Sequence, residues 1–398
     1  MNGNSQTNTT HDCVIVGAGL GGLAFALTRA RFGQPSLVLE SAAQLGEVGA
    51  GISLPPNALK ILWRLGLQEA LAGAISVPDH GEIRRGDTGR LLAEIPFGAP
   101  LVERYGAPFA QIHRADLHRC LLDAALATNL VDIRTSHAVA SAEPGDSSVT
   151  VRTSSGNQLE ARAVIGSDGI RSTLRESHFN QTPARFTRHV AWRCLIPMER
   201  LPETLHGPRS IVNVMDHRML VHYPVRHGTL LNCAAFVGEM DWSVESWHEP
   251  GDVAELHSYF AAFRDDCQHV LAAIPADACH RWAIYDREPI VNWATDRIAL
   301  LGDAAHPMPP YMGQGAAMAI EDAFVLATAM NAHDNLREAF AEYQHHRTER
   351  ANTTLEESRA AGRRFQEPGA DTDRFDNDQA LRSERMFAYE PTSPLVCH

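Results

Sequence analysis

Residues 12–27 read DCVIVGAGLGGLAFAL: a short β-prone run ends on a glycine turn, and an Ala- and Leu-rich helical stretch follows. In such a turn Gly17 permits the tight bend off the strand, Gly19 lets the backbone approach a pyrophosphate, and Gly22 allows close packing of helix against strand. The free N–H groups and the dipole of the helix N-terminus favour an anion at this place. The stretch therefore predicts the pyrophosphate-binding turn of a dinucleotide site.

A second β-prone run, residues 36–40, ends on an acid, Glu40, which lies 18 residues after Gly22. An acid at about this spacing bonds the ribose hydroxyls of a bound dinucleotide. A glycine turn alone is weak evidence, because such turns also occur for packing. Here a strand precedes the turn, a helix follows it and an acid ends the next strand, so the sequence predicts a β-α-β nucleotide-binding unit.

Two further glycine–aspartate motifs come later in the chain, and each follows an apolar run. Gly166-Ser167-Asp168-Gly169 follows residues 163–165, and Gly302-Asp303 follows residues 298–301. This placement sends an aspartate off the carboxyl end of a β-strand, where open α/β sheets bind ligands. Asp303 suits a ribityl hydroxyl, whereas for Asp168 alone an ordinary Asp-Gly turn is the alternative. Three such motifs, far apart in the sequence, indicate one large cofactor held by distant parts of the chain, and FAD is the prediction.

The composition excludes several other classes of protein. The chain has 398 residues and a formal net charge of −13 without a long basic run, so it shows no electrostatic footprint for nucleic acid. No apolar run approaches the roughly 18 residues that span a bilayer, and residues 1–11 are polar, without a signal-peptide stretch, and are expected to form a loose tail. Seven cysteines lie apart without a CxxC pair, and the 20 histidines form no HExxH motif. We expect a cytoplasmic protein with reduced thiols, no metal, and no nucleic-acid or membrane partner.

The remaining patterns divide the chain into two kinds of structure. Helical periodicity covers residues 55–67, 117–126, 252–274, 315–330 and 347–364, and β-prone runs cover 148–153, 161–165 and 298–301. Closely spaced strand-like runs, broken by Pro, Gly and charged turns, cover 190–196, 210–215, 219–225 and 230–237. The expected fold class is α/β, with a Rossmann-like FAD-binding domain into which a mostly antiparallel β-sheet substrate domain is inserted.

The domain boundaries follow from these patterns. The FAD-binding domain is expected over residues 10–75, 108–180 and 286–360, the substrate domain over 76–107 and 181–285, and a C-terminal tail over 361–398. Within the tail, residues 367–379 are rich in Asp and Gly and are typical of a flexible linker. The Asp- and Arg-rich stretch 374–385 is expected to be solvated, the alternatives being that it covers the pocket or packs on a neighbouring molecule.

The glycine and aspartate motifs, with Glu40 and the stretch 168–172, resemble the three fingerprints of the single-component (group A) FAD-dependent aromatic hydroxylases. Further stretches are similar to the branch that acts on salicylate, 3-hydroxybenzoate and 6-hydroxynicotinate; they are Gly49–Ile52, Pro56–Ala58, His113–Leu117, Ala191–Arg193 and His306–Ala317. The similarity covers roughly residues 10–360. The resemblance implies a p-hydroxybenzoate-hydroxylase-like fold.

By this resemblance, FAD lies extended across the first domain. The residues expected to hold it are Gly17, Gly19, Gly21, Gly22, Glu40, Ser41, Ser53, Arg114, Asp168, Asp303, Gly313, Gly315 and Ala316. Arg114 and Asp303 are expected at the ribityl–pyrophosphate section, and residues 313–317 at the pyrimidine end of the isoalloxazine ring. The helix that begins near Gly315 carries about half a positive charge at its N-terminus, which stabilises an anionic reduced flavin. Only one GxGxxG occurs, so NADH or NADPH is expected to act as a transient reductant.

The strand over residues 217–225 is expected to face the substrate, because it resembles a family strand that carries a His and a Tyr four positions apart. Two registers match: one places Arg218 and His222 in those positions, the other Met219 and Tyr223. Alternation of side chains along a strand means that both pairs cannot face the ring. Neither register supplies the His at the first position, so His222 or Tyr223 is expected to accept the phenolic proton. A packed or solvated sheet residue is the alternative for each.

Other candidate pocket residues follow from the same resemblance. Ser53 stands where the hydroxynicotinate branch has a histidine, and Tyr311 stands at another polar pocket position, as a candidate catalytic residue; both departures argue against simple hydroxynicotinate chemistry. Pro309 is a candidate substrate contact in the same loop. Arg193 is a candidate for binding a substrate carboxylate, with an ordinary surface ion pair as the alternative.

The resemblance implies an NAD(P)H-dependent monooxygenase that hydroxylates a phenolic aromatic acid or a hydroxylated heteroaromatic through a flavin C4a-hydroperoxide, with loss of CO2 for a salicylate-like substrate. A flavin-dependent halogenase is one alternative, since residues 192–197 superficially match its signature, but Cys194 stands where that signature has a second Trp. A non-hydroxylating electron-transfer protein of the same fold is another. A small aromatic substrate, NAD(P)H and O2 are the expected partners, and the chain is expected to be a monomer or homodimer.

Overall fold

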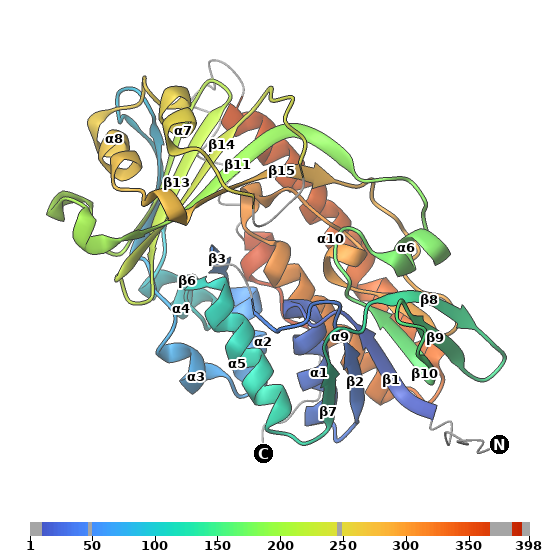
Figure 1. Ribbon diagram of the computed structural model, residues 1–398. Coiled ribbons are helices and arrows are strands. Elements are labelled where there is room, and N and C mark those ends of the chain that lie inside the picture. The colour runs from blue at the N-terminus through green and yellow to red at the C-terminus, as the bar shows by residue number, and fades with distance from the viewer. Residues whose placement is uncertain (1–9, 47–49, 245–248, 367–383, 392–398) are drawn as a thin grey trace.

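The computed structural model describes residues 10–46, 50–244, 249–366 and 384–391. Two large β-sheets organise these residues, one low and one high in the view of Figure 1. The strands that the first sheet takes from the early and late parts of the chain are β1 (Thr10–Val16), β2 (Ser36–Leu39), β7 (Val131–Arg134), β8 (Val139–Pro144), β9 (Val149–Thr153), β10 (Gln158–Gly166) and β16 (Ile298–Leu300).

The centre of the first sheet is parallel. Its order is β7-β2-β1-β10, and β16 lies beside the last part of β10, so that β1, β10 and β16 are parallel neighbours. Strands β9 and β8 continue the sheet in antiparallel fashion from the first part of β10. The last four residues of β1 and of β10, and all of β2 and β16, are buried and largely apolar, which is what a sheet covered on both faces requires.

The second sheet has the order β15-β11-β14-β13-β12-β4-β5 and is antiparallel except where β12 pairs with β4. Its strands are β4 (His80–Arg85), β5 (Leu91–Pro96), β11 (Arg185–Pro197), β12 (Arg209–Met215), β13 (Arg218–Val225), β14 (Leu230–Val237) and β15 (Cys279–Asp286). A two-stranded ladder of β3 (Gly51–Leu54) and β6 (Ala110–His113) lies between the two large sheets in the view of Figure 1.

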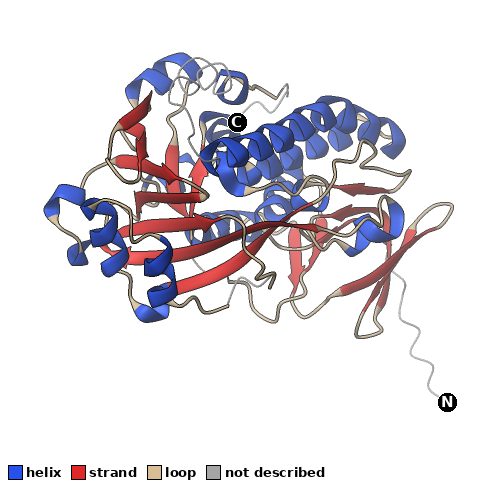
Figure 2. Ribbon diagram, turned by 90° about the horizontal axis from the view of Figure 1, so that it is seen from above, coloured by secondary structure: helices blue, strands red, loops and turns tan. Residues whose placement is uncertain are grey.

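Helices cover the first sheet and connect it to the second. They are α1 (Leu20–Arg31), α2 (Pro56–Arg64), α3 (Gln68–Ala72), α4 (Ala99–Tyr105), α5 (Arg114–Leu126), α6 (Thr173–His178), α7 (Val253–Tyr259), α8 (Asp265–Ala272), α9 (Gly315–Ala332) and α10 (Leu336–Gln366). Helix α9 packs on α1, and α10 packs on α9 and then reaches β12 and β13 of the second sheet. Viewed from above, a long helix runs past both groups of strands (Figure 2).

Most of the predicted elements are confirmed, and so is the α/β fold class. The four strand-like runs expected after residue 185 correspond to β11, β12, β13 and β14, and the early β-α-β unit corresponds to β1, α1 and β2. The helix expected over residues 252–274 is instead two helices, α7 and α8. Phe260 and Phe263, in the break between them, are buried and pack against each other with ring centroids 4.8 Å apart, so tertiary packing interrupts the helix.

The two ends of the chain also differ from expectation. Strand β1 already includes Thr10 and His11, and α10 continues through Gln366, past the point where the tail was expected to begin. The stretch predicted to be a flexible linker, 367–379, lies outside the described residues. Glu384–Pro391, however, packs on the first domain: Tyr389 lies beneath the Arg350 guanidinium at 3.9 Å, and Glu390 pairs with Lys60 at 2.6 Å.

Candidate functional site: a dinucleotide cradle facing a sheet

The three glycine–aspartate motifs meet at one edge of the first sheet. Gly17, Ser167 and Leu301 each directly follow one of three neighbouring parallel strands, β1, β10 and β16, so the motifs leave the same carboxyl edge. Ser167 donates its hydroxyl to the carbonyl oxygens of Val16 and Gly17, both at 2.9 Å. The first two motifs are thus fastened directly to each other.

Several glycines of these motifs exist for close packing. Gly17 has a φ of +103°, and a Cβ atom there would lie 2.5 Å from the Ser167 carbonyl oxygen. A Cβ atom on Gly22 would lie 2.1 Å from the Gly17 carbonyl oxygen, and one on Gly21 would lie 2.7 Å from the Leu301 side chain. At these positions any side chain collides with the backbone or the core, so they shape the turn itself.

Gly19 is different, because a Cβ atom there would meet no protein atom within 4 Å. Gly19 is the N-cap of α1, no side chain caps this helix end, and its first turn carries no acid. The N–H groups of the first turn therefore point away from the protein with the positive end of the helix dipole behind them. This open, glycine-lined helix end fits a pyrophosphate.

Glu40 lies beside this turn. Its Oε2 accepts a hydrogen bond from the Ala18 N–H at 2.8 Å, and its Oε1 accepts from the Ala42 N–H at 2.8 Å and from the Ser41 hydroxyl at 3.0 Å. The His118 Nε2 lies 2.8 Å from the Ala18 carbonyl oxygen on the helix α5 side. The structure therefore holds the acid at the end of β2 against the glycine turn, where a ribose would follow the pyrophosphate.

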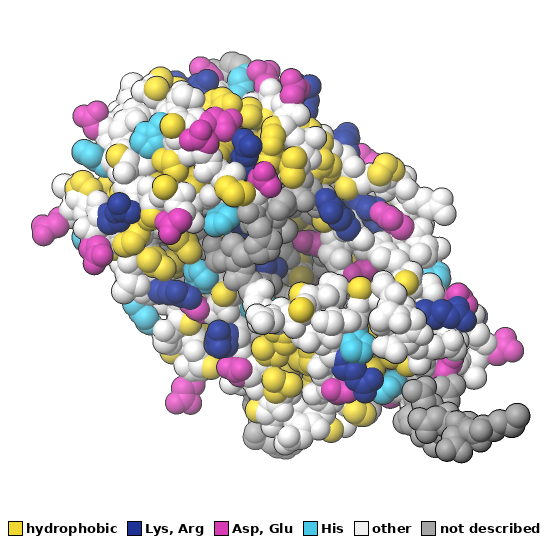
Figure 3. Space-filling model, in the orientation of Figure 1, with side chains coloured by type: hydrophobic (Ala, Val, Ile, Leu, Met, Phe, Trp, Pro, Cys, Tyr) yellow, Lys and Arg dark blue, Asp and Glu magenta, His cyan; other side chains and the backbone are white. Residues whose placement is uncertain are grey.

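Asp303 belongs to the 3-10 turn Gly302–Ala304 and is exposed, yet protein surrounds it closely enough that desolvation raises the pKa of its carboxyl. The charges of His306 and Arg114 act in the opposite direction. A carboxyl that is both accessible and enclosed lines an internal recess rather than the outer surface. The space-filling view is hollowed between the two domains (Figure 3). The sequence-predicted pair Arg114 and Asp303 is thus close enough for the charge of one to act on the other.

The two carboxylate oxygens of Asp168 differ in their hydrogen bonding. Its Oδ2 accepts from the Thr173 N–H at 2.9 Å, whereas its Oδ1 is buried and has no hydrogen-bond partner among the described residues. Burial raises the pKa of this carboxyl. A buried carboxylate oxygen without a donor costs free energy, so this atom fits a ligand hydroxyl.

Arg175, which the sequence analysis missed, connects the second motif to the third. Its buried guanidinium donates to the carbonyl oxygens of Ala305 at 2.6 Å, Ala304 at 3.3 Å and Glu288 at 2.9 Å. Desolvation lowers its pKa to about 10, and the nearby charge of Arg287 adds to this effect.

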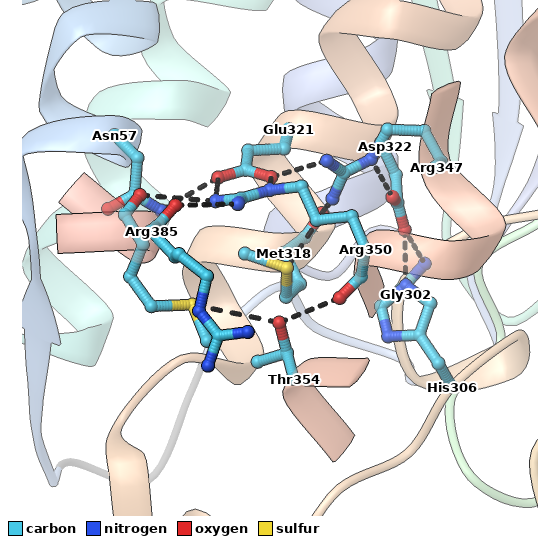
Figure 4. A network of polar contacts seen from close by, with 11 residues as sticks. Asn57, Gly302, His306, Met318, Glu321, Asp322, Arg347, Arg350, Thr354 and Arg385 are labelled. Carbon is cyan, nitrogen blue, oxygen red and sulfur yellow. Dashed lines mark hydrogen bonds and ion pairs between the residues drawn. The ribbon is translucent and has the colours of Figure 1, made fainter. Parts of the chain in front are cut away.

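A buried network of charged side chains fixes α9 behind the third motif (Figure 4). Asp322, on α9, accepts from the Gly302 N–H at 2.9 Å and from the Arg347 Nε at 2.7 Å, and it lies 2.5 Å from the His306 Nε2. Burial alone would raise the Asp322 pKa, but the charges of His306 and Arg347 outweigh it and lower the pKa to about 2. The carboxylate therefore stays ionised and joins α9, α10 and the Gly302 turn.

Glu321, the neighbour of Asp322, completes the network. Its carboxylate accepts from the Asn57 amide at 2.7 Å and from the guanidinium groups of Arg347 and Arg350. The side chains of Arg347, Glu321 and Asp322 are all 0% exposed. Fully buried charges persist only when they are paired and hydrogen-bonded, as they are here.

The N-terminus of α9 is open in the same way as that of α1. A Cβ atom on Gly315 would meet no protein atom within 4 Å, no acid lies in the first turn, and no side chain caps the helix. Gly313 has a φ of +63°, and a Cβ atom there would lie 3.3 Å from the Ser53 hydroxyl. Ser53, Gly313 and the start of α9, which includes Ala316, therefore lie together, as the flavin-binding prediction requires.

The second sheet has an inner face toward the first domain and an outer face. Leu220 and Cys233 pack on the outer face against residues of α7 and α8. Met219 and Val221 lie on the inner face, in a cluster that includes Tyr311 and Met312. The Tyr223 ring lies against Gly51 of β3, since a Cβ atom on that glycine would be 2.6 Å from the ring, so Tyr223 shares the inner face.

The register that places Arg218 and His222 at the substrate is therefore wrong. By alternation along β13, both side chains lie on the outer face with Leu220. Burial, together with the charges of Arg209 and Arg84, lowers the pKa of His222 to about 4, although Glu82 acts in the opposite direction. The Met219 and Tyr223 register fits the inner face, and burial raises the pKa of Tyr223, which keeps the phenol protonated.

The inner face also carries Arg193 and a group of aromatic rings. Arg193 is 6% exposed, so the alternative of an ordinary surface ion pair is wrong, and its guanidinium lies 4.4 Å from the centre of the Trp282 ring. Phe236 packs between Trp282 at 6.4 Å and Tyr311 at 5.5 Å. Pro309 is buried immediately before the Tyr311 turn, and its carbonyl oxygen accepts from the Ser358 hydroxyl at 2.5 Å.

The part of the chain that the structure describes lacks a metal-binding cluster and a membrane-spanning helix. No three His, Cys, Asp or Glu side chains gather there in an arrangement that could hold a metal ion. None of the helices in the described ranges is long and apolar enough to cross a bilayer.

Comparison with known proteins agrees with this geometry. Residues 10–358 match the family described as the FAD binding domain. The chain is 37% identical over 377 residues to a 3-amino-4-hydroxybenzoate 2-monooxygenase of Streptomyces platensis, covering 94% of this chain and 93% of the relative. It is 37% identical over 362 residues to the 3-hydroxybenzoate 6-hydroxylase of Polaromonas naphthalenivorans, covering 90% and 89%. The structure of Klebsiella pneumoniae HpxO with FAD and uric acid superposes with a TM-score of 0.81 at 26% identity, covering 97% and 95%.

The chain belongs to the FAD-binding domain family. It is an FAD-dependent aromatic monooxygenase, and NAD(P)H serves as its reductant. The predicted resemblance and the predicted FAD are thereby confirmed, and the halogenase alternative is not supported. The residues assigned to individual parts of the cofactor remain predictions that the geometry above fits.

The buried network predicts a large effect of removing Arg347. We expect R347M to lower the free energy of unfolding by about 3–5 kcal/mol, because Glu321 and Asp322 would remain buried without their main counter-charge. Urea unfolding of the variant and the wild type measures the difference. R337M, which removes an exposed partner of Asp296, is the matched control and should leave the midpoint nearly unchanged. An R347M protein as stable as R337M contradicts this account of the network.

Because the helix end at Gly19 is open, a side chain added there should weaken FAD binding without affecting folding. We expect G19A to weaken FAD binding by roughly tenfold or more, because a methyl group would stand where the backbone approaches the pyrophosphate. The melting temperature of the FAD-free protein should stay unchanged, because a Cβ atom meets no protein atom there. Flavin fluorescence during titration of the apoprotein measures the affinity. G73A, on an exposed glycine that is equally open, is the control; equal FAD affinities of the two variants would rule out this placement of the pyrophosphate.

Proposed function

We propose that the enzyme hydroxylates the ring of a phenolic aromatic carboxylic acid of the hydroxybenzoate type. The observation that carries this proposal is the buried Arg193 on the inner face, within an aromatic-lined wall that faces the flavin-binding domain. A net charge of −13 makes a local cation necessary for an anionic substrate. Near full-length similarity to enzymes named for 3-amino-4-hydroxybenzoate and 3-hydroxybenzoate supports the same substrate class.

The chemistry divides between cofactor and protein. Bound FAD supplies the oxygen chemistry after reduction by NADH or NADPH. The open helix ends at Gly19 and Gly315 are the groups that would hold its pyrophosphate and its ring. The positive end of α9 would there favour negative charge on the ring. Met219, Phe236 and Trp282 line the inner face with apolar surface that excludes water from the reacting atoms.

The cellular setting follows from the reductant. The cysteines among the described residues are all free, and the reaction consumes NAD(P)H, so we place the enzyme in the cytoplasm.

A substrate panel tests the reaction directly. We expect 3-amino-4-hydroxybenzoate, 3-hydroxybenzoate or another hydroxybenzoate to stimulate NADH or NADPH oxidation and to yield a ring-hydroxylated product in proportion. Salicylate, 4-hydroxybenzoate and 6-hydroxynicotinate complete the panel, with products identified by mass spectrometry. Stimulated oxidation that yields only hydrogen peroxide with every compound would instead favour a non-hydroxylating protein of this fold.

If Arg193 binds the substrate carboxylate, its loss should weaken the binding of substrates that carry this group. We expect R193M to raise the Kd of the accepted hydroxybenzoate by about 10- to 100-fold, because a charge-assisted hydrogen bond contributes about 1.5–3 kcal/mol. The Kd of the matching phenol without a carboxylate should change little. The control is R188M. Arg188 lies on the same strand, but its side chain is exposed and pairs with Asp241. Equal losses for the acid and the phenol would show that Arg193 supports the fold and not the carboxylate.

A further inference from the structure

Tyr311 and His189 form a close pair on the inner face. The Tyr311 hydroxyl and the His189 Nδ1 share a short hydrogen bond, and the two rings meet edge to face with centroids 5.7 Å apart. They come from distant parts of the chain: His189 belongs to β11, and Tyr311 to the 3-10 turn Pro310–Met312. Neither the composition nor any motif in the sequence indicates that they meet.

The surroundings hold Tyr311 rigidly at the edge of the cofactor cradle. Its ring packs on Phe236 at 5.5 Å, and a Cβ atom on Gly362 of α10 would lie 2.5 Å from the same ring. Two residues further along the chain, Gly313 lies beside Ser53 at the start of α9. The Tyr311 ring therefore lies between the substrate sheet and α10, two residues before the segment assigned to the flavin ring.

His189 has the protonation state that a proton acceptor needs. Desolvation, and after it the charge of His217, lowers the pKa of His189 to about 4, so the imidazole is neutral near neutral pH. A neutral imidazole whose Nδ1 carries no proton accepts the Tyr311 O–H. His189 is only partly buried, and it lies where the pairing of β11 with β15 is irregular, between Phe186 and Val190.

We propose that Tyr311 and His189 take up the phenolic proton of the substrate, with Tyr311 in contact with the substrate and His189 acting through it. This inference rests on the proposed function. The phenol O–H bond breaks and its proton passes to the Tyr311 oxygen, while the Tyr311 proton passes to the His189 Nδ1. The partly exposed imidazole then releases the proton of its Nε2 to water. The products are a bound phenolate, an unchanged tyrosine, a neutral histidine and one proton in solution.

The pair supplies what β13 lacks. In the register that fits the inner face, the first candidate position is Met219, which accepts no proton, and His222 lies on the outer face. Tyr223 is held protonated by its burial. Among the described residues considered for the pocket, the Tyr311–His189 pair joins a phenol of the inner-face cluster to a neutral, partly exposed imidazole.

The rate of ionisation of bound substrate tests the pair without turnover. The accepted hydroxybenzoate is bound to the oxidised FAD-loaded enzyme without NAD(P)H, the pH is raised rapidly by stopped-flow mixing, and the formation of its phenolate is followed by ultraviolet absorbance. We compare the wild type with Y311F and H189N; the asparagine still accepts a hydrogen bond from Tyr311 but cannot take its proton. Y285F removes a phenol hydroxyl of the same sheet that bonds the Ser243 carbonyl oxygen, and it is the control.

We expect the wild type and Y285F to form the bound phenolate at the same rate after the pH jump. Both Y311F and H189N should slow this proton release by about tenfold or more, because each interrupts the path from the phenol to water. FAD content and melting temperature identify a variant that has failed to fold, and two variants at different positions keep the test independent of either one.

Three results would overturn the proposal. A wild-type rate of phenolate formation in both variants would make the pair a structural brace only. A slower rate in Y311F alone would remove His189 from the path. An equally slow rate in Y285F would make the effect non-specific. Failure of the proposed function is distinguishable from all three, because then the wild type itself would hydroxylate no compound of the panel.

Discussion

The rest of the structure depends on one buried carboxylate, that of Asp322, having hydrogen-bond and ion-pair partners. Burying an ionised carboxylate costs several kcal/mol unless charges and hydrogen bonds compensate it. Here the Gly302 N–H, His306 and Arg347 all bond to it, and they come from the third motif, from the loop after it and from α10. Because one side chain satisfies all three, the third motif cannot shift relative to α9. The open N-terminus of that helix is thereby fixed with respect to Asp303.

Helix α10 extends this constraint from the cofactor cradle to the substrate face. Arg347 lies in its first half, at the buried network, and Gly362 lies near its end, against the Tyr311 ring. A single rigid helix therefore sets both the start of α9 and the position of the Tyr311 hydroxyl. Reactions that depend on a positioned ring require such rigidity, because an error of about 1 Å can cost roughly a hundredfold in rate. The aromatic wall of the inner face and the helix ends opposite it form one assembly.

Local rules predicted much of this architecture, and long-range pairing decided the rest. Gly17 and Gly22 are recognisable because backbone sterics alone require them, and alternation predicted that only one register of β13 could face the pocket. The choice between the two registers of β13 depended on which face of the second sheet α7 and α8 cover, and the local sequence pattern does not indicate that face. His189 was missed because its partner is more than a hundred residues away in the sequence. The adjacent acids Glu321 and Asp322, inside a strongly apolar helix, were an available signal of a buried charge network.

The central claim is that oxygen from O2 enters the ring of a phenolic acid held between α9 and the inner face. The most direct measurement is the reaction under 18O2 with the hydroxybenzoate that stimulates NAD(P)H oxidation, followed by mass spectrometry of the product. One labelled oxygen atom is expected in each product molecule, with close to one product for each NAD(P)H consumed. A product without label, or oxidation that ends only in hydrogen peroxide, would contradict it.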